Sequence, residues 1–339
     1  MKFALYLAMF VAALMVVSAA PSKKACKAIT DARENAVCKK YCGNSGYLLG
    51  ECGSTGICIC KNKKKAPTTT LEHVYGISSV LAALRAKKRT NLDALYYYAI
   101  PSTKKKDQSL MSNILELAKE TQLKTVSVDK GRLNNLTDNK LHQGVVLSAS
   151  PRDPIEISSL TGLDLSNTYQ ALPRINKRGN PNHTNVLPSI QLTAPKRKPF
   201  WIALDEVQDP QNLGSILRTA YFFGVDGVLL CSKNSAPISP TVSKVSSGAA
   251  ELMDIYSTPN LVKFLKESHL NGWEIIGAAG EANPSLTLSQ FRHKASEHPL
   301  ILVLGNEGTG LRTNVKSACN QFVSIPSAQP PSFNGSVDI

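Results

Sequence analysis

Apolar residues in the middle of the chain follow two spacings. Two stripes at helical spacing predict helices, over residues 77–84 and 110–117. Three short apolar runs predict strands, over residues 92–100, 124–128 and 144–147. This alternation predicts a small α/β domain over residues 72–150.

The last 140 or so residues repeat the alternation on a larger scale. Six apolar runs predict strands, over residues 200–207, 227–231, 254–256, 273–278, 300–304 and 322–325. Apolar stripes predict helices over residues 213–220 and 261–265. We therefore expect a parallel sheet covered by helices on both faces over residues 199–339. In such sheets ligands bind beyond the carboxyl ends of the strands.

Residues 151–198 are rich in proline, asparagine, serine and threonine and show little periodicity. This composition predicts a flexible linker or insertion between the two domains.

The chain begins with Met1 and the basic residue Lys2, followed by an apolar stretch over residues 3–17 and the small residues Ser18 to Ala20. This pattern is typical of a secretory signal, which we assign to residues 1–20. The apolar stretch is short for a membrane span. It has no arginine, whereas a mitochondrial presequence is rich in arginine.

Six of the eight cysteines lie within residues 21–65, and residues 66–71 form a linker behind them. Behind a signal, such density predicts a disulfide framework, because so small a segment buries little apolar area. Cys38 and Cys42 are one turn apart on an expected helix over residues 35–41. Cys58 and Cys60 share one side of an expected strand. The spacing alone leaves the pairing open.

This block resembles the insect and fungal defensins, with Gly50-Glu51-Cys52 at their Gly-x-Cys turn before the final hairpin. The resemblance implies the bridges Cys26–Cys52, Cys38–Cys58 and Cys42–Cys60. A zinc module is the alternative, which the missing CxxC spacing and the lack of a nearby histidine disfavour. We expect no metal site. Cys231 and Cys319 are expected to be ordinary buried thiols.

The formal net charge of the 339 residues is +14. Such an excess favours a polyanionic partner, either a nucleic acid or an anionic membrane surface. Composition does not separate these two, and any single basic run is equally typical of a solvated loop.

Three motifs follow one another in the carboxyl-terminal half. They comprise residues 205–220, which contain Asn212-Leu-Gly and Arg218; residues 302–311, which contain Gly305-Asn-Glu-Gly-Thr-Gly310; and Ile325-Pro326 followed by Ser332-Phe-Asn334. They resemble motifs one, two and three of the SpoU/TrmH branch of SPOUT RNA methyltransferases. Residues 74–84 and 142–146 resemble the substrate-binding domain of that family, and residues 234–249 resemble members that modify a guanosine ribose of mitochondrial large-subunit rRNA.

The resemblance covers about residues 72–339 and implies a SPOUT trefoil-knot parallel sheet with a small RNA-binding domain before it. It implies S-adenosylmethionine as cofactor, rRNA as substrate, a homodimer and a mitochondrial location. Cofactor contacts are implied for backbone atoms at Gly305, Ile325 and Phe333, and Gly310 would let the main chain approach the cofactor closely.

In the family the arginine at position 218 acts on the target nucleotide. A guanidinium releases its proton reluctantly, so we expect Arg218 to hold a phosphate and stabilise the developing alkoxide. Asn212, Ser332 and Asn334 are expected to position the ribose, and Glu307 to orient the site. The alternatives are that Asn212 only caps a helix and that Glu307 is a solvated turn residue.

After motif three the chain reads Asn334-Gly-Ser-Val-Asp-Ile339, where the family continues into a terminal helix. In the family that helix completes the knot and part of the dimer interface, so its absence weakens the expectation of cofactor binding and dimerisation.

Two functional hypotheses of different classes follow. The first is ribose 2′-O-methylation of rRNA. The second is a secreted, cationic, defensin-like antimicrobial peptide that acts on an anionic microbial membrane, fused to a truncated methyltransferase; the merging of two neighbouring genes would explain such a fusion. The glycosylation acceptor Asn334-Gly-Ser argues against a secreted enzyme, because a sugar would occupy an expected site residue.

Overall fold

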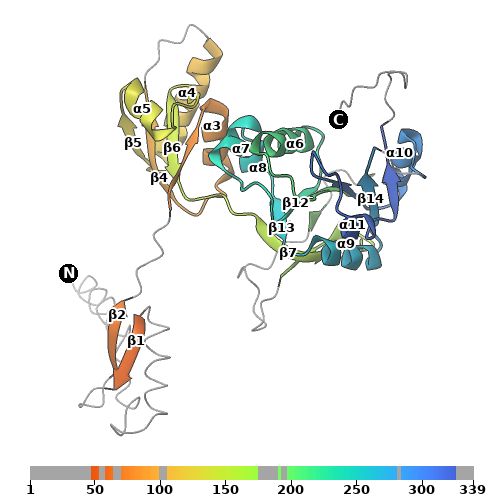
Figure 1. Cartoon of the computed structure of the whole chain (residues 1–339). Coiled ribbons are helices and arrows are strands. Elements are labelled where there is room, and N and C mark those ends of the chain that lie inside the picture. Colours follow the sequence, from red (N-terminus) through yellow and green to blue (C-terminus); the bar gives the residue numbers. More distant parts are fainter. Residues whose placement is uncertain are drawn as a thin grey trace, which may run out of the picture. The chain divides into compact units, whose positions relative to one another are not determined.

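The computed structural model describes the backbone of residues 47–52, 58–63, 70–98, 105–174, 190–191, 197–280 and 284–325. Side chains are described for residues 70–98, 107–174, 197–280 and 284–325. The chain divides into two units, Met1–Thr69 and Thr70–Ile339 (Figure 1). Among the described residues no helix is both long and apolar enough to cross a membrane.

The first unit contains an antiparallel hairpin of β1 (Tyr47–Cys52) and β2 (Cys58–Lys63), in which Cys52 lies opposite Cys58. The strand expected around Cys58 and Cys60 is confirmed. Gly50-Glu51-Cys52 lies inside the first strand and not before the hairpin. The signal over residues 1–20, the helix over 35–41 and the side chains of all six expected bridging cysteines lie outside the described residues.

The second unit begins with a four-stranded sheet of order β3-β6-β4-β5. Its strands are β3 (Glu72–Tyr75), β4 (Leu92–Tyr97), β5 (Lys124–Ser127) and β6 (Val145–Ala149). Its helices are α3 (Ile77–Ala86), α4 (Lys105–Glu120) and α5 (Lys130–Leu136). One core joins Val80 and Leu84 of α3 with Ile114 of α4 and Leu147 of β6. The small α/β domain predicted from the apolar stripes is therefore present.

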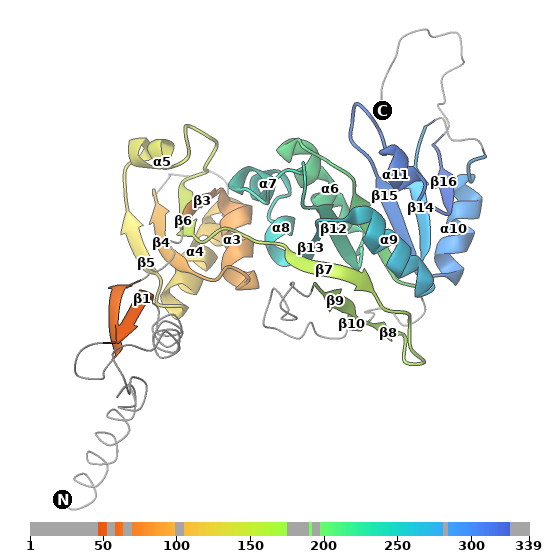
Figure 2. The ribbon, with the colours of Figure 1, turned by 60° about the horizontal axis from the view of Figure 1, so that its bottom comes forward.

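A larger sheet follows, in the order β16-β14-β15-β11-β12-β13-β7-β9, in which all pairs are parallel except β7 with β9 (Figure 2). The strands are β7 (Ile155–Leu160), β9 (Ala171–Pro173), β11 (Phe200–Leu204), β12 (Gly227–Cys231), β13 (Ile255–Thr258), β14 (Glu274–Ala278), β15 (Leu300–Leu304) and β16 (Gln321–Val323). The predicted parallel sheet is confirmed.

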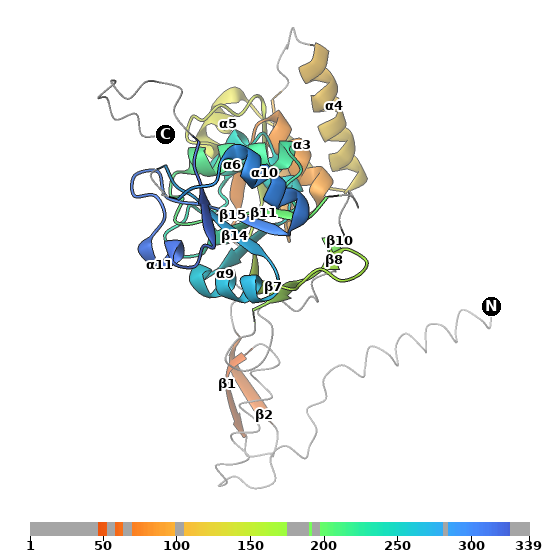
Figure 3. The same cartoon turned by 90° about the vertical axis from the view of Figure 1, so that its right-hand side faces the viewer.

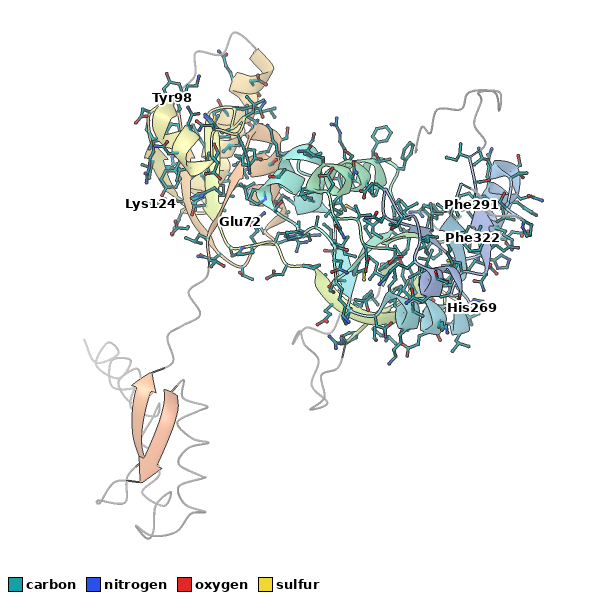
Figure 4. The ribbon with its side chains drawn as sticks, in the orientation of Figure 1. Glu72, Tyr98, Lys124, His269, Phe291 and Phe322 are labelled. Carbon is teal, nitrogen blue, oxygen red and sulfur yellow. The ribbon has the colours of Figure 1, made fainter. Side chains whose placement is uncertain are left out.

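Helices cover both faces of this sheet (Figure 3). Alternate residues of β11 point to opposite faces, so Trp201 enters the core under α9 and Ile202 enters the core under α6. Phe291 of α10, labelled in Figure 4, packs on Phe200 of β11, with ring centroids 6.3 Å apart. The helices are α6 (Pro210–Phe222), α7 (Pro240–Val245), α8 (Ala249–Leu252), α9 (Leu261–Leu270), α10 (Leu288–Glu297) and α11 (Thr313–Lys316).

The flexible linker predicted over residues 151–198 is wrong for its described first half. Strand β7 joins the large sheet beside β13, and β8 (Thr168–Tyr169) pairs with β10 (Ile190–Gln191). The indole of Trp201 donates a 2.7 Å hydrogen bond to the hydroxyl of Tyr169, and the indole of Trp273 donates one of 2.8 Å to the carbonyl of Thr161. These aromatic contacts order the segment although its sequence is rich in loop-forming residues.

Candidate active site

A tight loop follows β15 at the carboxyl end of the sheet, where ligands bind in folds of this kind. The backbone amides of Asn306 and Gly310 each donate to the other residue's carbonyl, at 3.1 and 2.9 Å. Inside the loop, the Oδ1 atom of Asn306 accepts a hydrogen bond from the amide of Gly308 at 2.9 Å. The loop is therefore closed by its own backbone and braced by one side chain.

Gly305 stands where this loop closes on itself. A Cβ atom at this position would lie 2.5 Å from both the Gly310 carbonyl oxygen and the Leu311 amide nitrogen. No heavy atom of the described residues lies within 4 Å of a Cβ placed on Gly310, whose φ is 65°. The loop therefore requires glycine at both positions, and its Gly310 side is open for a ligand to approach the backbone.

Motif one reaches this loop from helix α6. The side-chain amide of Asn212 donates a 2.8 Å hydrogen bond to Oε1 of Glu307. The cap of α6 is Asp209, whose side chain accepts from the amide of Gln211 at 3.0 Å. The capping alternative for Asn212 is thus wrong, because this residue lies inside the helix. Glu307 is an exposed turn residue, as its alternative held, and is in addition bonded to Asn212 across 95 sequence positions.

Arg218 lies further along α6, where its side chain is exposed. The neighbouring residue Leu217 is fully buried in the core under the helix, so the helix is firmly held at this point. No hydrogen bond or ion pair of Arg218 is seen within the part of the chain that the structure describes. A guanidinium with five donors is therefore available to an anionic ligand.

An ion pair between Asp205 and Arg312, which we did not predict from the sequence, anchors the end of the loop over residues 305–310 to strand β11. Asp205, fully buried at the end of β11, accepts from the guanidinium Nε of Arg312 at 2.8 Å and from its backbone amide at 3.1 Å. The hydrogen bond to Asp205 raises the pKa of Arg312. Asn306 donates to the carbonyl of Glu206 at 3.0 Å, which ties motif two to motif one a second time. The only signal for this ion pair in the sequence is the carboxylate of Asp205, which directly follows a run of apolar residues.

The remaining predicted site residues are not brought together by the described part of the chain. Ile325 is 80% exposed. Ser332, Phe333 and Asn334 lie outside the described residues. No group of three or more metal-ligating side chains occurs among those that are described.

An apolar hollow of about 380 Å³ opens between α6 and strands β11 and β15. It is lined by Phe200, Ile202, Ser215, Ile216, Thr219, Ala220, Phe223, Val225 and Leu304. Two hydroxyl groups are the only polar side-chain groups of this lining, so the hollow lacks the polar groups that orient a nucleotide. The hollow is therefore better suited to bind an apolar surface than a nucleotide.

A parallel sheet covered on both faces, with a glycine loop bonded to a polar helix at its carboxyl end, defines the class of α/β proteins with a ligand site at that end. Solved structures of similar fold include an AdoMet-bound rRNA methyltransferase from Sinorhizobium meliloti, with a TM-score of 0.53 and 19% identity over 78% of this chain and 81% of that one. Another is the SpoU methyltransferase AviRb from Streptomyces viridochromogenes, with a TM-score of 0.52 and 18% identity over 77% of this chain and 82% of that one. These likenesses confirm the predicted SPOUT fold class.

The sequence is related to a named family over most of the second unit. Residues 199–337 match the SpoU rRNA Methylase family, and residues 73–154 match the family described as RNA 2'-O ribose methyltransferase substrate binding. The protein named rRNA methyltransferase 1, mitochondrial, from Schizosaccharomyces pombe is 34% identical over 75% of this chain and 82% of the relative. The chain therefore belongs to the SpoU rRNA methylase family, as the motifs predicted.

Other relatives are matched over different shares of their length. The chain spans 62% of the Saccharomyces cerevisiae protein of the same name, at 34% identity over 75% of this chain. It spans 41% of the Dictyostelium discoideum one, at 36% identity over 65% of this chain. A 23S rRNA (guanosine-2'-O-)-methyltransferase RlmB from Ralstonia nicotianae is 31% identical over 75% of this chain and 86% of that protein.

Proposed function

We propose that the chain transfers the methyl group of S-adenosylmethionine to a ribose 2′-hydroxyl of mitochondrial large-subunit rRNA, at a guanosine. The hydrogen bond between Asn212 and Glu307 carries this proposal, because it joins two motifs at the ligand-binding end of the sheet. The names of the mitochondrial relatives and of the guanosine-specific bacterial relative support the substrate. The match to an RNA substrate-binding family over residues 73–154 supports RNA as partner.

The loop over residues 305–310 fits a nucleotide cofactor. Its backbone is open at Gly310, where a side chain would otherwise stand. Gly305 and Gly310 would hold the cofactor through backbone atoms, with Ile325 and Phe333 completing the site as the family resemblance implies. Bound there, S-adenosylmethionine supplies an electrophilic methyl group. The rigid closure of the loop would keep the surrounding groups in fixed positions.

The reacting hydroxyl must lose a proton and develops negative charge as it does so. The exposed guanidinium of Arg218 carries a permanent charge and is suited to hold the adjacent phosphate and to stabilise that charge. Asn212 and Glu307 would orient the ribose from the side of the loop, and Ser332 and Asn334 from the third motif. Arg218 would then act by electrostatic stabilisation and not as a base.

Replacement of Arg218 by alanine in the full chain tests this function. Removal of one preorganised donor to a developing oxyanion costs about 100-fold in rate. We expect methyl transfer to a large-subunit rRNA transcript to fall by about that factor, whereas the dissociation constant of S-adenosylmethionine stays within about twofold. Arg292→Ala, at an exposed position of α10, serves as the charge-matched control. Full activity of the Arg218 variant would remove this residue from the mechanism.

The location of the protein belongs to the same proposal. The names of the relatives favour mitochondria, whereas the leader over residues 1–20 is typical of secretion. We expect the methyltransferase half to be found inside mitochondria, because its rRNA substrate is there. Cell fractionation with protease protection measures this, and recovery of the whole protein from the culture medium would contradict it.

A further inference from the structure

Two lysines, Lys140 before β6 and Lys244 on α7, each form a hydrogen bond across the junction between the two domains of the second unit. Lys140, in the loop before β6, donates a 3.4 Å hydrogen bond to the hydroxyl of Thr241 on α7. The hydroxyl of Tyr75 at the end of β3 lies 3.4 Å from the same oxygen. The ammonium of Lys140 also lies 5.9 Å from the centre of the Tyr75 ring. The substrate-binding domain and the large sheet therefore share a polar junction here.

Lys244, one turn along α7 from Thr241, lies across the start of α3. Its ammonium donates a 2.5 Å hydrogen bond to the side-chain carbonyl of Gln143. Its stem passes over Gly76, where a Cβ atom would lie 3.0 Å from Cδ of the lysine. Gly76 has a φ of 92°, which only glycine adopts readily. The backbone of the small domain is thus shaped around this lysine.

Neither ammonium is paired with a carboxylate among the described residues, in contrast to other basic groups of the unit. Arg89, Arg197 and Arg312 each contact at least one carboxylate. Lys244 is half-buried, and burial lowers the pKa of its ammonium. Withdrawing a cation from water without an anion is unfavourable, and such groups cluster where proteins bind ligands.

A buried, uncharged histidine lies at the same junction. His142 is buried; its Nδ1 accepts from the amide of Gly144 at 3.0 Å, and its Nε2 lies 2.9 Å from Oδ1 of Asn134, so the ring is neutral. Burial, followed by the nearby charges of Lys130 and Lys244, lowers the pKa of His142. The imidazole therefore remains uncharged in a field set by lysines.

We infer that Lys140 and Lys244 bind backbone phosphates of the RNA at the junction of the two domains, as one clamp. This inference rests on the proposed RNA substrate and deepens it by naming where the strand crosses between the domains. Val242 of α7 shares a buried core with Leu213 and Leu217 of α6. Helix α7, which carries Lys244, is therefore packed on helix α6, which carries Arg218.

The inference is tested by RNA binding to the full chain over a series of salt concentrations, with a short single-stranded RNA of mixed sequence as probe. Each lost phosphate contact lowers the slope of log K against log salt by about 0.7 for a single strand. We expect Lys140→Met and Lys244→Met each to weaken binding about tenfold and to lower that slope by about this amount. Lys140→Arg, which keeps the charge, should preserve both values.

Lys263→Met removes the same charge from α9, on the opposite face of the sheet, and should leave the slope unchanged. Unfolding curves that match the wild type show that the variants are folded. Wild-type affinity and slope in both methionine variants would overturn the clamp, even if the enzyme methylates RNA. Wild-type RNA binding in both methionine variants, together with weakened binding of these variants to phosphatidylserine vesicles, would assign the lysines to a membrane surface. That outcome would also overturn the clamp. The clamp and the proposed reaction can be told apart. If the wild type transfers no methyl group but the methionine variants lose RNA binding, the clamp is supported and the proposed reaction is not.

Discussion

At the scale of single residues, Gly305 is the position whose side chain the structure most clearly forbids. A methyl group there would lie 2.5 Å from the backbone of Gly310 and Leu311, and backbone atoms cannot rotate away as a flexible side chain can. Gly305→Ala would therefore open the loop and break the paired hydrogen bonds between Asn306 and Gly310. We expect at least a tenfold loss of S-adenosylmethionine affinity, about 1.4 kcal/mol, measured by calorimetric titration.

Gly280→Ala is the matched control, because a Cβ atom at position 280 meets no heavy atom within 4 Å among the described residues. It should bind the cofactor as the wild type does. Unchanged affinity in Gly305→Ala would show that the closure of the loop is not needed for binding.

For the candidate site, sequence reasoning selected residues but did not predict the contacts between them. The ordered motifs predicted Asn212, Arg218 and Glu307, but the direct bond from Asn212 to Glu307 joins positions 95 apart. The pairing of Asp205 with Arg312 spans 107 positions and was not predicted. Spacing along the chain carries information about neighbours within one element, whereas pairs like these depend on how strands are ordered in the sheet.

At the scale of elements, the buried pair between Arg89 and Glu251 joins the substrate-binding domain to α8. The side chains of both residues are 1% exposed, and Arg89 also contacts Glu72 (labelled in Figure 4) and the carbonyl of Ser150. Removal of one partner leaves a buried, unpaired charge, which costs about 3–5 kcal/mol. We expect Arg89→Met to lower the free energy of unfolding in urea by that amount.

Lys88→Met tests the exposed neighbour at the same junction. Lys88 pairs with Asp254 at 2.6 Å, with the two side chains 28% and 51% exposed. An exposed pair contributes about 0–1 kcal/mol. If Arg89→Met and Lys88→Met lower the free energy of unfolding equally, burial does not increase the contribution of Arg89 to stability.

Elements with a clear apolar period were predicted, and those without one were missed. The stripes over residues 77–84 and 213–220 became α3 and α6. Strand β7 was not predicted, because prolines and serines surround its few apolar residues, although Ile157 and Leu160 are fully buried. Its order comes from contacts with β13 and with the aromatic core, which no local pattern displays.

At the scale of the whole molecule, the exposed aromatic end of α6 indicates an interface. Phe222 and Phe223 are 81% and 75% exposed, their rings lie 5.2 Å apart, and Tyr221 beside them is half exposed. Phe223 also lines the apolar hollow between α6 and the sheet. Contiguous exposed apolar surface of this kind is typical of protein–protein contacts. We therefore propose that two copies of the chain pair through this end of α6.

Phe222→Asp places a charge at the centre of that surface, and a buried unpaired charge strongly disfavours association. We expect the variant to be a monomer by light scattering after size-exclusion chromatography, at concentrations where the wild type is a dimer. Leu270→Asp is the control, since Leu270 is 84% exposed at the end of α9, on the other face of the sheet. A wild type that is monomeric at all concentrations would contradict the pairing, and a dimeric Phe222 variant would move the interface elsewhere.

Arg218 lies one turn before Phe222 on the same helix. Pairing through this end would therefore place the second copy next to the side of α6 where we propose that RNA binds. The monomeric variant should then also lose methyl transfer while it still binds S-adenosylmethionine.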